Sequence, residues 1–473
     1  MPEHHPETRS DADTYGLGNV KSPVFHLSTI FMAALARVDP YRMIVDHMTI
    51  EDNRLSVAFE TERHTILLDD FDRILVLGAG KGSARMARAV EDILGDRLSQ
   101  GLVVTKYGHG EPLTRIEVIE AAHPMPDEAG IVAARRIAAL AEEADERTLV
   151  LTLLSGGGSA LLCAPFSDPV HGISLDLADK QAVTGALLAS GADIGEMNCV
   201  RKHLSSVKGG RLMRLLAPAR SLTLILSDVV GDRLDTIASG PTYPDETSFS
   251  QALAILDKYG LKNSLPPAVR EVLALGVEGR IPETPKNGDQ ANALVDNILI
   301  GTNMAALSAA RDKGRELGYE VIPLTSSLTG EAREVAKVLF SIAKDIRDRS
   351  LLAHPPVLLL AGGETTVTLK GSGRGGRNQE MALAFLAEME KDEQKGENII
   401  FLSASTDGSD GPTDATGAFA STDILKRARD AGLSIRHFLA ANDSYHFFAA
   451  TGDLFKTGPT MTNVCDLHMV LIV

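Results

Sequence analysis

The sequence predicts an α/β protein with two domains, each a mostly parallel or mixed sheet flanked by helices in a Rossmann-like arrangement. Short apolar runs typical of buried strands alternate with helical patterns along most of the chain. Glycine-rich turns follow several of these runs directly, as they do where a strand of an open α/β sheet leads into a helix. The length of 473 residues exceeds that of most single domains.

The expected domain boundary lies in a polar linker at residues 282–290. Residues 1–22 are polar and acidic and are expected to form an N-terminal extension. Residues 23–285 would then form the N-terminal α/β domain, and residues 286–473 the C-terminal one. Near the start of the C-terminal domain, the pattern at residues 297–324 predicts a strand, a helix and a second strand joined as a βαβ unit.

Composition restricts the classes of function. The formal net charge is −16, whereas sequence-independent binding of nucleic acid needs a basic face, so no nucleic-acid partner is expected. The chain shows neither a signal-peptide pattern nor an apolar stretch as long as a membrane helix. Its three cysteines lie far apart, which favours free thiols in a reducing compartment. We expect a cytoplasmic protein; a homodimer is compatible with the sequence, which leaves the oligomeric state open.

The first candidate anion site follows the apolar strand at residues 73–77. Gly78, Gly80 and Lys81 belong to its turn, and an Ala/Met/Val helix comes next. The spacing does not fit a Walker A loop. It fits only two glycines of the dinucleotide fingerprint, because a serine takes the third place and the next strand ends at Lys106 instead of an acid. A lysine at a helix N-terminus is unfavourable unless an anion lies between it and the helix dipole, so this turn predicts a bound anion.

A second glycine-rich turn follows the apolar run at residues 149–154. Its members are Ser155, Gly156, Gly157, Gly158 and Ser159. They do not form the nucleophile elbow of a hydrolase, because Leu161 stands where the second glycine belongs. A backbone anion nest and simple close packing both remain open here. His123, between the two turns, is interpreted as structural.

Charged residues gather in two further places in this half of the chain. Residues 197–211 contain the cations Arg201, Lys202, Lys208 and Arg211. A basic solvated helix face and an anion pocket are equal alternatives for them. Asp228 ends the strand at residues 221–226 and is followed four residues later by Asp232. This pair suits a hard cation held partly through water, and ordinary turn chemistry is the alternative.

The densest polar pattern lies at residues 357–379. An apolar strand ends at two glycines, and Glu364 follows within a predicted hairpin. Arg374 and Arg377 lie among four glycines directly before a helix. Backbone N–H groups, the helix dipole and guanidinium groups together suit an oxyanion, whereas a flexible solvated loop is the alternative.

Asp407 belongs to an aspartate-rich turn after the predicted strand at residues 399–404. The turn does not match an EF-hand loop, but its carboxylates suit Mg²⁺ or the orientation of a hydroxyl group. Nearly all of these polar clusters follow strands, and open α/β sheets bind ligands at the carboxyl ends of strands. Anion sites combined with carboxylates suit phosphoryl transfer, in which positioning and charge neutralisation provide most of the catalysis.

In number and order these motifs resemble the glycerate 2-kinase family, whose C-terminal module is called MOFRL. The resemblance covers residues 25–473 and shows no departure at the motif positions. The segments that carry it include GAGKGSARMA, LLSGGGSALLCAPF, NCVRKHLSSVKGGRL, LILSDVVGD, LLLAGGETTVTLKGSGRGGRNQE and STDGSDGPTDATGAF.

The resemblance implies ATP-dependent phosphorylation of D-glycerate at its 2-hydroxyl, with Mg²⁺, at an active site in the cleft between two α/β domains. Lys81 would bind phosphate or stabilise the transferred charge. Arg374 and Arg377 would hold the substrate carboxylate or the γ-phosphate. Asp228 and Asp407 are candidates for the metal site or the general base. The predicted cofactor-binding residues are Gly78, Gly80, Ser155, Gly156, Gly157, Gly158, Ser159, Lys202, Glu364 and Asn442.

Two other functions stay open at this point. Members of the family also carry the label hydroxypyruvate reductase, which requires NAD(P)H and a dinucleotide site. The missing acid after residues 102–105 disfavours that activity. A non-catalytic protein that binds a sugar acid or a nucleotide would keep the glycines and Arg374, but it would not need Lys81 together with both Asp228 and Asp407.

Overall fold

The computed structural model describes residues 22–59, 62–262, 264–392 and 398–473. The chain divides into two compact units: unit 1 combines residues 1–39 with residues 302–473, and unit 2 consists of residues 40–301. The predicted extension at residues 1–22 lies, apart from Ser22, outside the described residues. The side chain of Ser22 accepts a hydrogen bond from the backbone N–H of Phe25 and caps the first helix.

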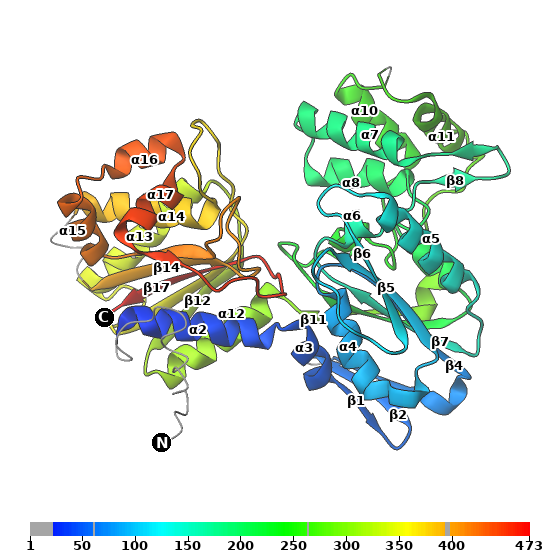
Figure 1. Ribbon diagram of the computed structural model, residues 1–473, viewed down its shortest axis with the longest axis horizontal. Helices are drawn as coiled ribbons and strands as arrows, with labels where there is room; N and C mark the ends of the chain where they lie inside the picture. Colours follow the sequence, from blue (N-terminus) through cyan, green and yellow to red (C-terminus); the bar gives the residue numbers. More distant parts are fainter. Residues whose placement is uncertain (1–21, 60–61, 263, 393–397) are drawn as a thin grey trace, which may run out of the picture. The chain divides into compact units, whose positions relative to one another are not determined.

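Unit 2 is built on a six-stranded sheet in which every neighbouring pair is parallel (Figure 1). Its spatial order is β11 (Val295–Gly301), β10 (Arg220–Leu226), β7 (Thr148–Leu154), β4 (Arg73–Ala79), β5 (Gln100–Lys106) and β6 (Ile116–Ala121). From β4 the chain runs outward to β6 and then returns to the other side of β4. The carboxyl ends of β4 and β7 therefore form the switch point at which open α/β sheets bind ligands.

Helices cover this sheet and add a second core. The helices that pack on or beside it are α3 (Pro40–His47), α4 (Ser83–Leu94), α5 (Glu128–Glu142), α6 (Gly158–Leu161) and α9 (Arg211–Leu216). A separate antiparallel sheet consists of β1 (Met48–Glu51), β2 (Arg54–Phe59) and β3 (Glu62–Leu67). Four more helices and the β8 (Ser167–Asp168) and β9 (Ile173–Ser174) hairpin form a group with its own apolar core around Phe249. These helices are α7 (Leu177–Ser190), α8 (Ile194–His203), α10 (Phe249–Lys258) and α11 (Pro267–Val277), and Figure 1 shows them gathered beyond one end of the sheet.

Unit 1 contains a mixed six-stranded sheet. Its order is β12 (Glu320–Leu328), β13 (Val357–Gly363), β17 (Asp466–Ile472), β14 (Ile399–Ser405), β15 (Gly417–Ala420) and β16 (Leu454–Phe455). Only the β12–β13 pair is parallel. Helices α2 (Pro23–Arg37) and α12 (Asn303–Glu316) lie on one side of the sheet, and α13 (Ala332–Arg349) and α14 (Arg377–Glu390) on the other (Figure 1). The remaining helices are α15 (Thr422–Asp430), α16 (Ile435–Ala441) and α17 (Ser444–Thr451).

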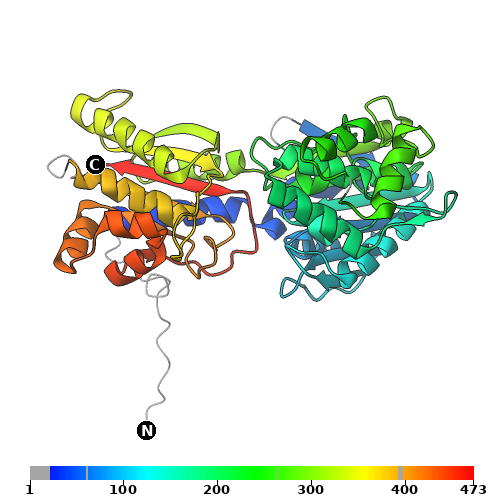
Figure 2. The ribbon, with the colours of Figure 1, turned by 90° about the horizontal axis from the view of Figure 1, so that it is seen from above.

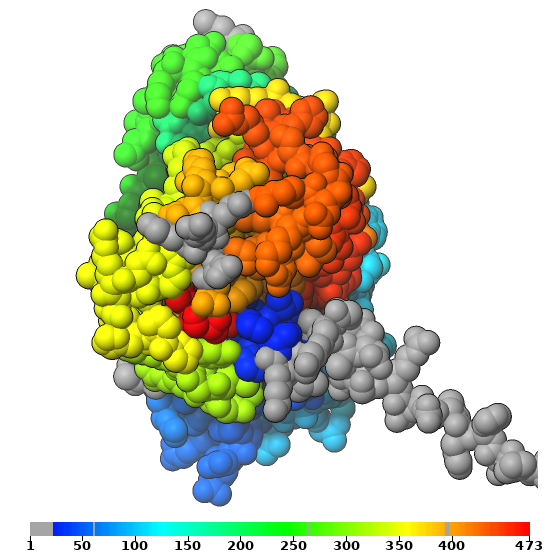
Figure 3. All heavy atoms as spheres, turned by 90° about the vertical axis from the view of Figure 1, so that its left-hand side faces the viewer, coloured from blue at the N-terminus to red at the C-terminus, as the bar shows by residue number. Residues whose placement is uncertain are grey.

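The C-terminal strand β17, red in Figure 2, lies in the middle of this sheet, and all seven of its residues are buried. Burial on both faces explains its apolar run, because helices cover the sheet on each side. Helix α2 contacts β17, and Figure 3 shows α2 in blue beside red residues at the end of the chain. The alternation of strands and helices in both units confirms the predicted fold class.

The division into units differs from the predicted domains at both ends of unit 2. Helix α2 buries Leu27, Ile30 and Phe31 and packs against α12, so residues 23–39 belong to unit 1. Strand β11 pairs with β10, and the change of unit falls after Gly301 instead of in the polar linker. The predicted βαβ unit is therefore wrong, because β11 and β12 belong to different sheets.

The predicted hairpin after β13 is also wrong. The chain leaves β13 at Gly363 and runs as a loop to α14, with one isolated bridge between Thr366 and Glu331. None of the described helices combines the length and the apolar character that crossing a bilayer requires.

His468 is a buried histidine within β17 whose surroundings keep it neutral. Its Nδ1 lies 2.9 Å from Ser403 Oγ, and its Nε2 has no hydrogen-bond partner in the described chain. Burial lowers the pKa of His468 to about 4, against an ordinary value of 6.5. Between these two values the unfolded chain binds a proton at this position and the folded chain does not. The free energy of unfolding therefore falls as the pH drops from 6.5 to 4.

Replacing His468 with glutamine should remove this part of the acid sensitivity. We expect the wild type to lose up to about 3 kcal/mol more stability than H468Q between pH 7.5 and pH 4.5. Urea unfolding at both pH values measures the difference, and every other titrating group is shared by the two proteins. If both proteins lose the same unfolding free energy between pH 7.5 and pH 4.5, His468 is protonated in the folded state at pH 4.5 and its pKa is not lowered by burial.

Candidate active site

The turns that follow β4 and β7 are joined by hydrogen bonds at the switch point of unit 2. The N–H of Lys81 donates to Gly156 O at 2.8 Å, and the N–H of Gly82 donates to Ser155 Oγ at 2.9 Å. In return the N–H of Ser155 donates to Ala79 O at 3.1 Å. The backbone donors of the first turn are therefore used within the protein and are not available to the anion expected beside Lys81.

The glycines of the first turn have a packing role. A Cβ on Gly78, which lies within β4, would come within 2.8 Å of Leu153 O. Gly80 has a φ of +137°, and a Cβ there would lie 2.5 Å from Ser155 O. Close passage of the two turns explains both glycines without a ligand.

The second turn has the open donors that the first lacks. Gly157 has a φ of +81°, in the left-handed region, and precedes α6. Within the described chain the backbone N–H groups of Gly156 and Gly157 reach no acceptor, and the same holds for Ser159. Successive open N–H groups at such a turn form a concavity for an anion. Of the two alternatives at residues 155–159, the structure favours the anion nest.

Lys81 and His123 border this nest. A Cβ on Gly157 would lie 2.9 Å from His123 Cδ2 and 3.4 Å from Lys81 Cγ, so both side chains rest against the turn. The Lys81 ammonium forms no ion pair or hydrogen bond with the described residues. Burial, and then the positive charge of Lys81, lower the pKa of His123 to about 4, so its imidazole is neutral at pH 7. The sequence alone did not indicate His123, because its neighbours in space come from other segments.

Asp228 lies against the same turn, at Gly156. It follows β10, next to β7 in the sheet, and a Cβ on Gly156 would lie 2.9 Å from Asp228 Cγ. Only a glycine at position 156 lets this carboxylate approach so closely. Lys81, His123, the open N–H groups and Asp228 thus gather at one edge of the sheet. The arrangement offers positive charge for an anion and a carboxylate for a proton or a cation.

Lys202 does not join this group. It is buried, and its ammonium lies 3.2 Å from Asp245 Oδ1 and 3.6 Å from Asp235 Oδ2. Two carboxylates balance its charge, so we assign it to the structure of unit 2.

In unit 1 the predicted oxyanion site before α14 already holds an anion, the carboxylate of Asp410. Asp410 Oδ1 accepts from the N–H of Asn378 at 3.0 Å, and Oδ2 accepts from the N–H of Gln379 at 2.8 Å. Burial raises the pKa of Asp410 to about 6. The helix start binds negative charge as the sequence predicted, but the protein supplies that charge itself.

The glycines around Arg374 pack tightly against the rest of unit 1. A Cβ on Gly376 would overlap Asp410, and one on Gly373 would lie 2.7 Å from Ala441 O. Asn442, which was predicted to contact a cofactor, is buried and accepts through Oδ1 from the N–H groups of Lys370 and Gly371 at 2.8 and 2.9 Å. These contacts fix the loop, and they account for both the glycines and Asn442.

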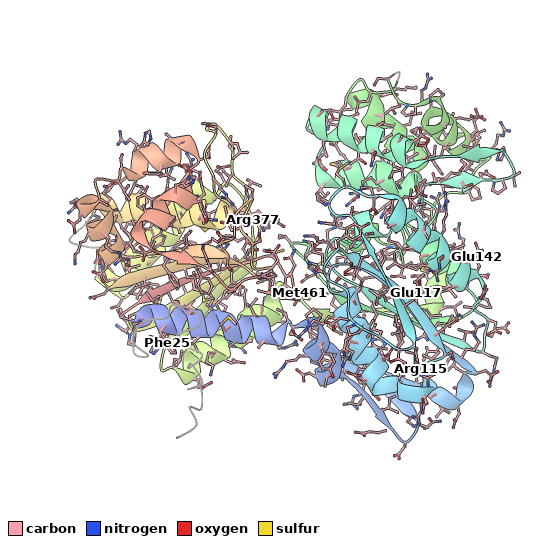
Figure 4. The ribbon with its side chains drawn as sticks, in the orientation of Figure 1. Phe25, Arg115, Glu117, Glu142, Arg377 and Met461 are labelled. Carbon is pink, nitrogen blue, oxygen red and sulfur yellow. The ribbon has the colours of Figure 1, made fainter. Side chains whose placement is uncertain are left out.

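Both arginines of the loop have partners in the protein. Arg377, labelled in Figure 4, is in the first turn of α14; its Nε donates to Asp466 at 2.5 Å and its Nη1 donates to Glu364 at 2.6 Å. Arg374 donates to Pro412 O at 2.9 Å, and its guanidinium lies 4.8 Å from the centre of the Tyr445 ring. Each is therefore held in place before a ligand binds.

Glu364 and Asp407 are the partly accessible carboxylates of unit 1 among the predicted site residues. Burial raises the pKa of Glu364, and the neighbouring charges of Asp466 and Asp407 act in the same direction. Asp407 accepts from Ser405 Oγ at 3.0 Å and from the N–H of Ser409 at 2.9 Å. In the described parts of the chain, no three His, Cys, Asp or Glu side chains are grouped for a metal ion.

Comparison with known proteins places the chain in a family. Residues 26–274 match the model of a domain of unknown function (DUF4147), and residues 357–466 match that of the MOFRL family. A D-glycerate 2-kinase from Thermotoga maritima is 42% identical over 405 residues, which are 85% of this chain and 92% of the relative. The chain belongs to the glycerate kinase family.

A crystal structure of a glycerate kinase from the same organism shares the fold of this family member. It has a TM-score of 0.81 at 39% identity and covers 94% of this chain and 99% of its own. A protein from Agrobacterium vitis, provisionally named a hydroxypyruvate reductase, is 43% identical over 449 residues, 94% of each chain. The resemblance to the glycerate kinase family is confirmed, and names within the family divide between two activities.

In this member of the glycerate kinase family, unit 2 has the strand order of doubly wound dinucleotide-binding folds. A hydroxypyruvate reductase would need a dinucleotide site there, so the residues at that site test the name. Strand β5 ends at Lys106, where an acid would bind the ribose. Ser83 is buried and donates to Gly80 O at 2.8 Å and to Val104 O at 3.0 Å, in the place of the third glycine. Both positions depart from the pattern of a dinucleotide site.

Proposed function

We propose that this protein transfers the γ-phosphoryl group of ATP to the 2-hydroxyl of D-glycerate and forms 2-phosphoglycerate and ADP. The observation that carries the proposal is the unpaired ammonium of Lys81 beside the open N–H groups of Gly156 and Gly157. Phosphoryl transfer is accelerated mainly by positioning and by donors aimed at the oxygens of the transferred group. The relatives named as glycerate kinases supply the identity of the acceptor.

In this proposal the nest at residues 155–159 holds phosphate oxygens, and Lys81 neutralises the charge that develops on them. The neutral His123 completes the wall of the site and can donate one hydrogen bond and accept another. Asp228, which lies against Gly156, accepts the proton of the 2-hydroxyl or holds a metal ion. Because the helix start of α14 is occupied by Asp410, we assign no phosphate to that position.

The residues present fit Mg²⁺, which proteins bind through one or two carboxylates together with substrate phosphates. Asp228 beside the nest provides such a carboxylate, and Asp407 stays the second predicted ligand. When bound, the ion would neutralise negative charge on the phosphate groups. The prediction that the active site lies between the two domains stays a prediction, as does the homodimer. The three cysteines are free and buried, which agrees with the proposed cytoplasmic location.

A paired assay tests the function. One reaction contains D-glycerate, ATP and Mg²⁺, with ADP release followed and enolase added to consume 2-phosphoglycerate. The other contains hydroxypyruvate with NADH or NADPH. We expect ADP release and a product that enolase consumes. A product that enolase refuses would place the phosphate on the 3-hydroxyl, and cofactor oxidation without ADP release would establish the reductase instead.

A further inference from the structure

One group of three cations in unit 2 has no carboxylate partner in the described chain. They are Lys180 in α7, Arg201 in α8 and Lys208 in the turn before α9, and we call them the cationic cluster. No ion pair joins any of them to a carboxylate of the described chain. Their neighbours differ: Lys202 pairs with Asp245, and Arg214 pairs with Asp289 at 2.7 Å. Arg211 also forms no ion pair with a described residue, but unlike Arg201 it donates hydrogen bonds to the carbonyl oxygens of Lys202 and Ser205, at 3.2 and 2.7 Å.

The members of the cationic cluster lie close enough to repel one another. Burial lowers the pKa of Lys180 to about 8, and the charge of Arg201 acts in the same direction. Burial also lowers the pKa of Lys208, followed by the charges of Arg201 and Lys180. Buried charges in proteins are normally paired, so an unpaired group of like charges is costly to maintain.

The cluster also has unused hydrogen-bond donors. Lys180 donates to Leu204 O at 3.2 Å, and Lys208 donates to Ser159 O at 2.6 Å and to Ser159 Oγ at 3.2 Å. The guanidinium of Arg201 donates no hydrogen bond to any described residue, and the residue is only partly buried. A guanidinium has five N–H donors in a planar fork that matches a carboxylate or a phosphate.

Lys208 connects the cluster to the proposed active site. Ser159, its hydrogen-bond acceptor, belongs to the same turn as Gly157, which Lys81 contacts. The loop arginines of unit 1, which were expected to hold the substrate carboxylate, are engaged by Asp466, Glu364 and Pro412. Because Lys208 adjoins the nest, the cluster offers the substrate carboxylate a group of cations within unit 2 itself.

We propose that Lys180, Arg201 and Lys208 form the pocket for the carboxylate of the hydroxy acid substrate. The identity of that substrate rests on the proposed function, whereas the existence of an oxyanion site does not. A phosphate of the nucleotide has the same chemistry, and separate titrations distinguish the two sources.

The test measures binding without turnover on the full-length protein. Calorimetric titrations with D-glycerate, in the presence of ADP and Mg²⁺, and separate titrations with ADP, would compare the wild type with R201Q and R214Q. Arg214 is the matched control, because it has the same charge but is paired with Asp289. We expect the Kd for D-glycerate to rise about tenfold or more in R201Q. The Kd for ADP in R201Q, and both constants in R214Q, should stay within about twofold.

A purely structural role for Arg201 predicts a different result. Without ligand, the melting temperature of R201Q should equal or exceed that of the wild type, because a repelling charge has been removed. A clear loss of melting temperature would make Arg201 a structural residue and overturn the proposal. An unchanged Kd for D-glycerate in R201Q, or no binding of D-glycerate to the wild type, would also overturn the proposal. If R201Q weakens only the binding of ADP, the cluster belongs to the nucleotide site instead. Binding of D-glycerate that depends on Arg201 without ADP release in the paired assay would refute the kinase and leave the carboxylate pocket in place.

Discussion

Replacing Lys81 with alanine should lower the turnover number for phosphoryl transfer by about 100- to 1,000-fold while the protein stays folded. Lys81 has no partner in the described chain, and it rests against Gly157 beside the open N–H groups. Loss of a donor aimed at developing charge costs ~2.7–4 kcal/mol of transition-state stabilisation. The initial rate of ADP release at saturating D-glycerate and ATP measures the effect.

A charge-matched control lies on the helix that follows the same turn. Arg88 in α4 is exposed and pairs with Asp92 at 3.3 Å, so R88A should keep the turnover of the wild type. A second readout does not depend on activity: the pKa of His123, lowered by burial and by Lys81, should rise when that positive charge is removed. NMR titration measures the pKa of His123 in both proteins. Near-normal turnover of K81A would exclude Lys81 from the mechanism, and an unchanged pKa of His123 would contradict the geometry of the site.

Replacing Asp410 with alanine should destabilise unit 1 by about 3 kcal/mol or more. Asp410 is buried and accepts from the backbone N–H groups of Asn378 and Gln379, and the side chain of Gln379 donates to it at 2.9 Å. Without the carboxylate these donors stay buried at the start of α14 with no acceptor. Urea unfolding followed by circular dichroism gives the change in free energy.

Asp414 provides the control in the same loop. It is exposed and pairs with Lys456 at 2.8 Å, and such surface pairs contribute about 0–1 kcal/mol. D414A should therefore be nearly as stable as the wild type. If D410A and D414A lose the same amount of stability, the helix start of α14 does not depend on Asp410, and an external anion at that position would again be the better interpretation.

The parts of the site that depend on local sequence were predictable. An apolar run that leads through glycines into a helical pattern predicts a strand, a turn and a helix. Parallel pairing then brings the carboxyl ends of β4, β7 and β10 to one edge of the sheet. Lys81, the turn at residues 155–159 and Asp228 follow from that rule alone. Which turn keeps its N–H groups open does not follow, because the acceptors for Lys81 and Gly82 come from the other turn.

The remaining features depend on pairings between distant segments. Arg201 and Lys202 are adjacent in the sequence, yet only Lys202 meets Asp245, which lies in a turn far along the chain. Asp410, in the loop after β14, accepts hydrogen bonds from the start of α14. The same loop contains several other aspartates, and the sequence does not indicate which of them does so. Likewise, the apolar face of α2 matched the core of either unit, and only its contact with α12 decides between them.

The insertion of unit 2 between α2 and the rest of unit 1 has a consequence for biosynthesis. The ribosome releases α2 first, then all of unit 2, and only afterwards α12 and the sheet that α2 covers. Unit 2 can therefore fold before the packing partners of α2 have been made. During that time the apolar face of α2 is exposed, and a chaperone could shield it. Because β17 follows every other described strand in the sequence and lies between β13 and β14 in the sheet, unit 1 cannot close until β17 has been made. A chain that stops before β17 would contain a complete unit 2 and no stable unit 1.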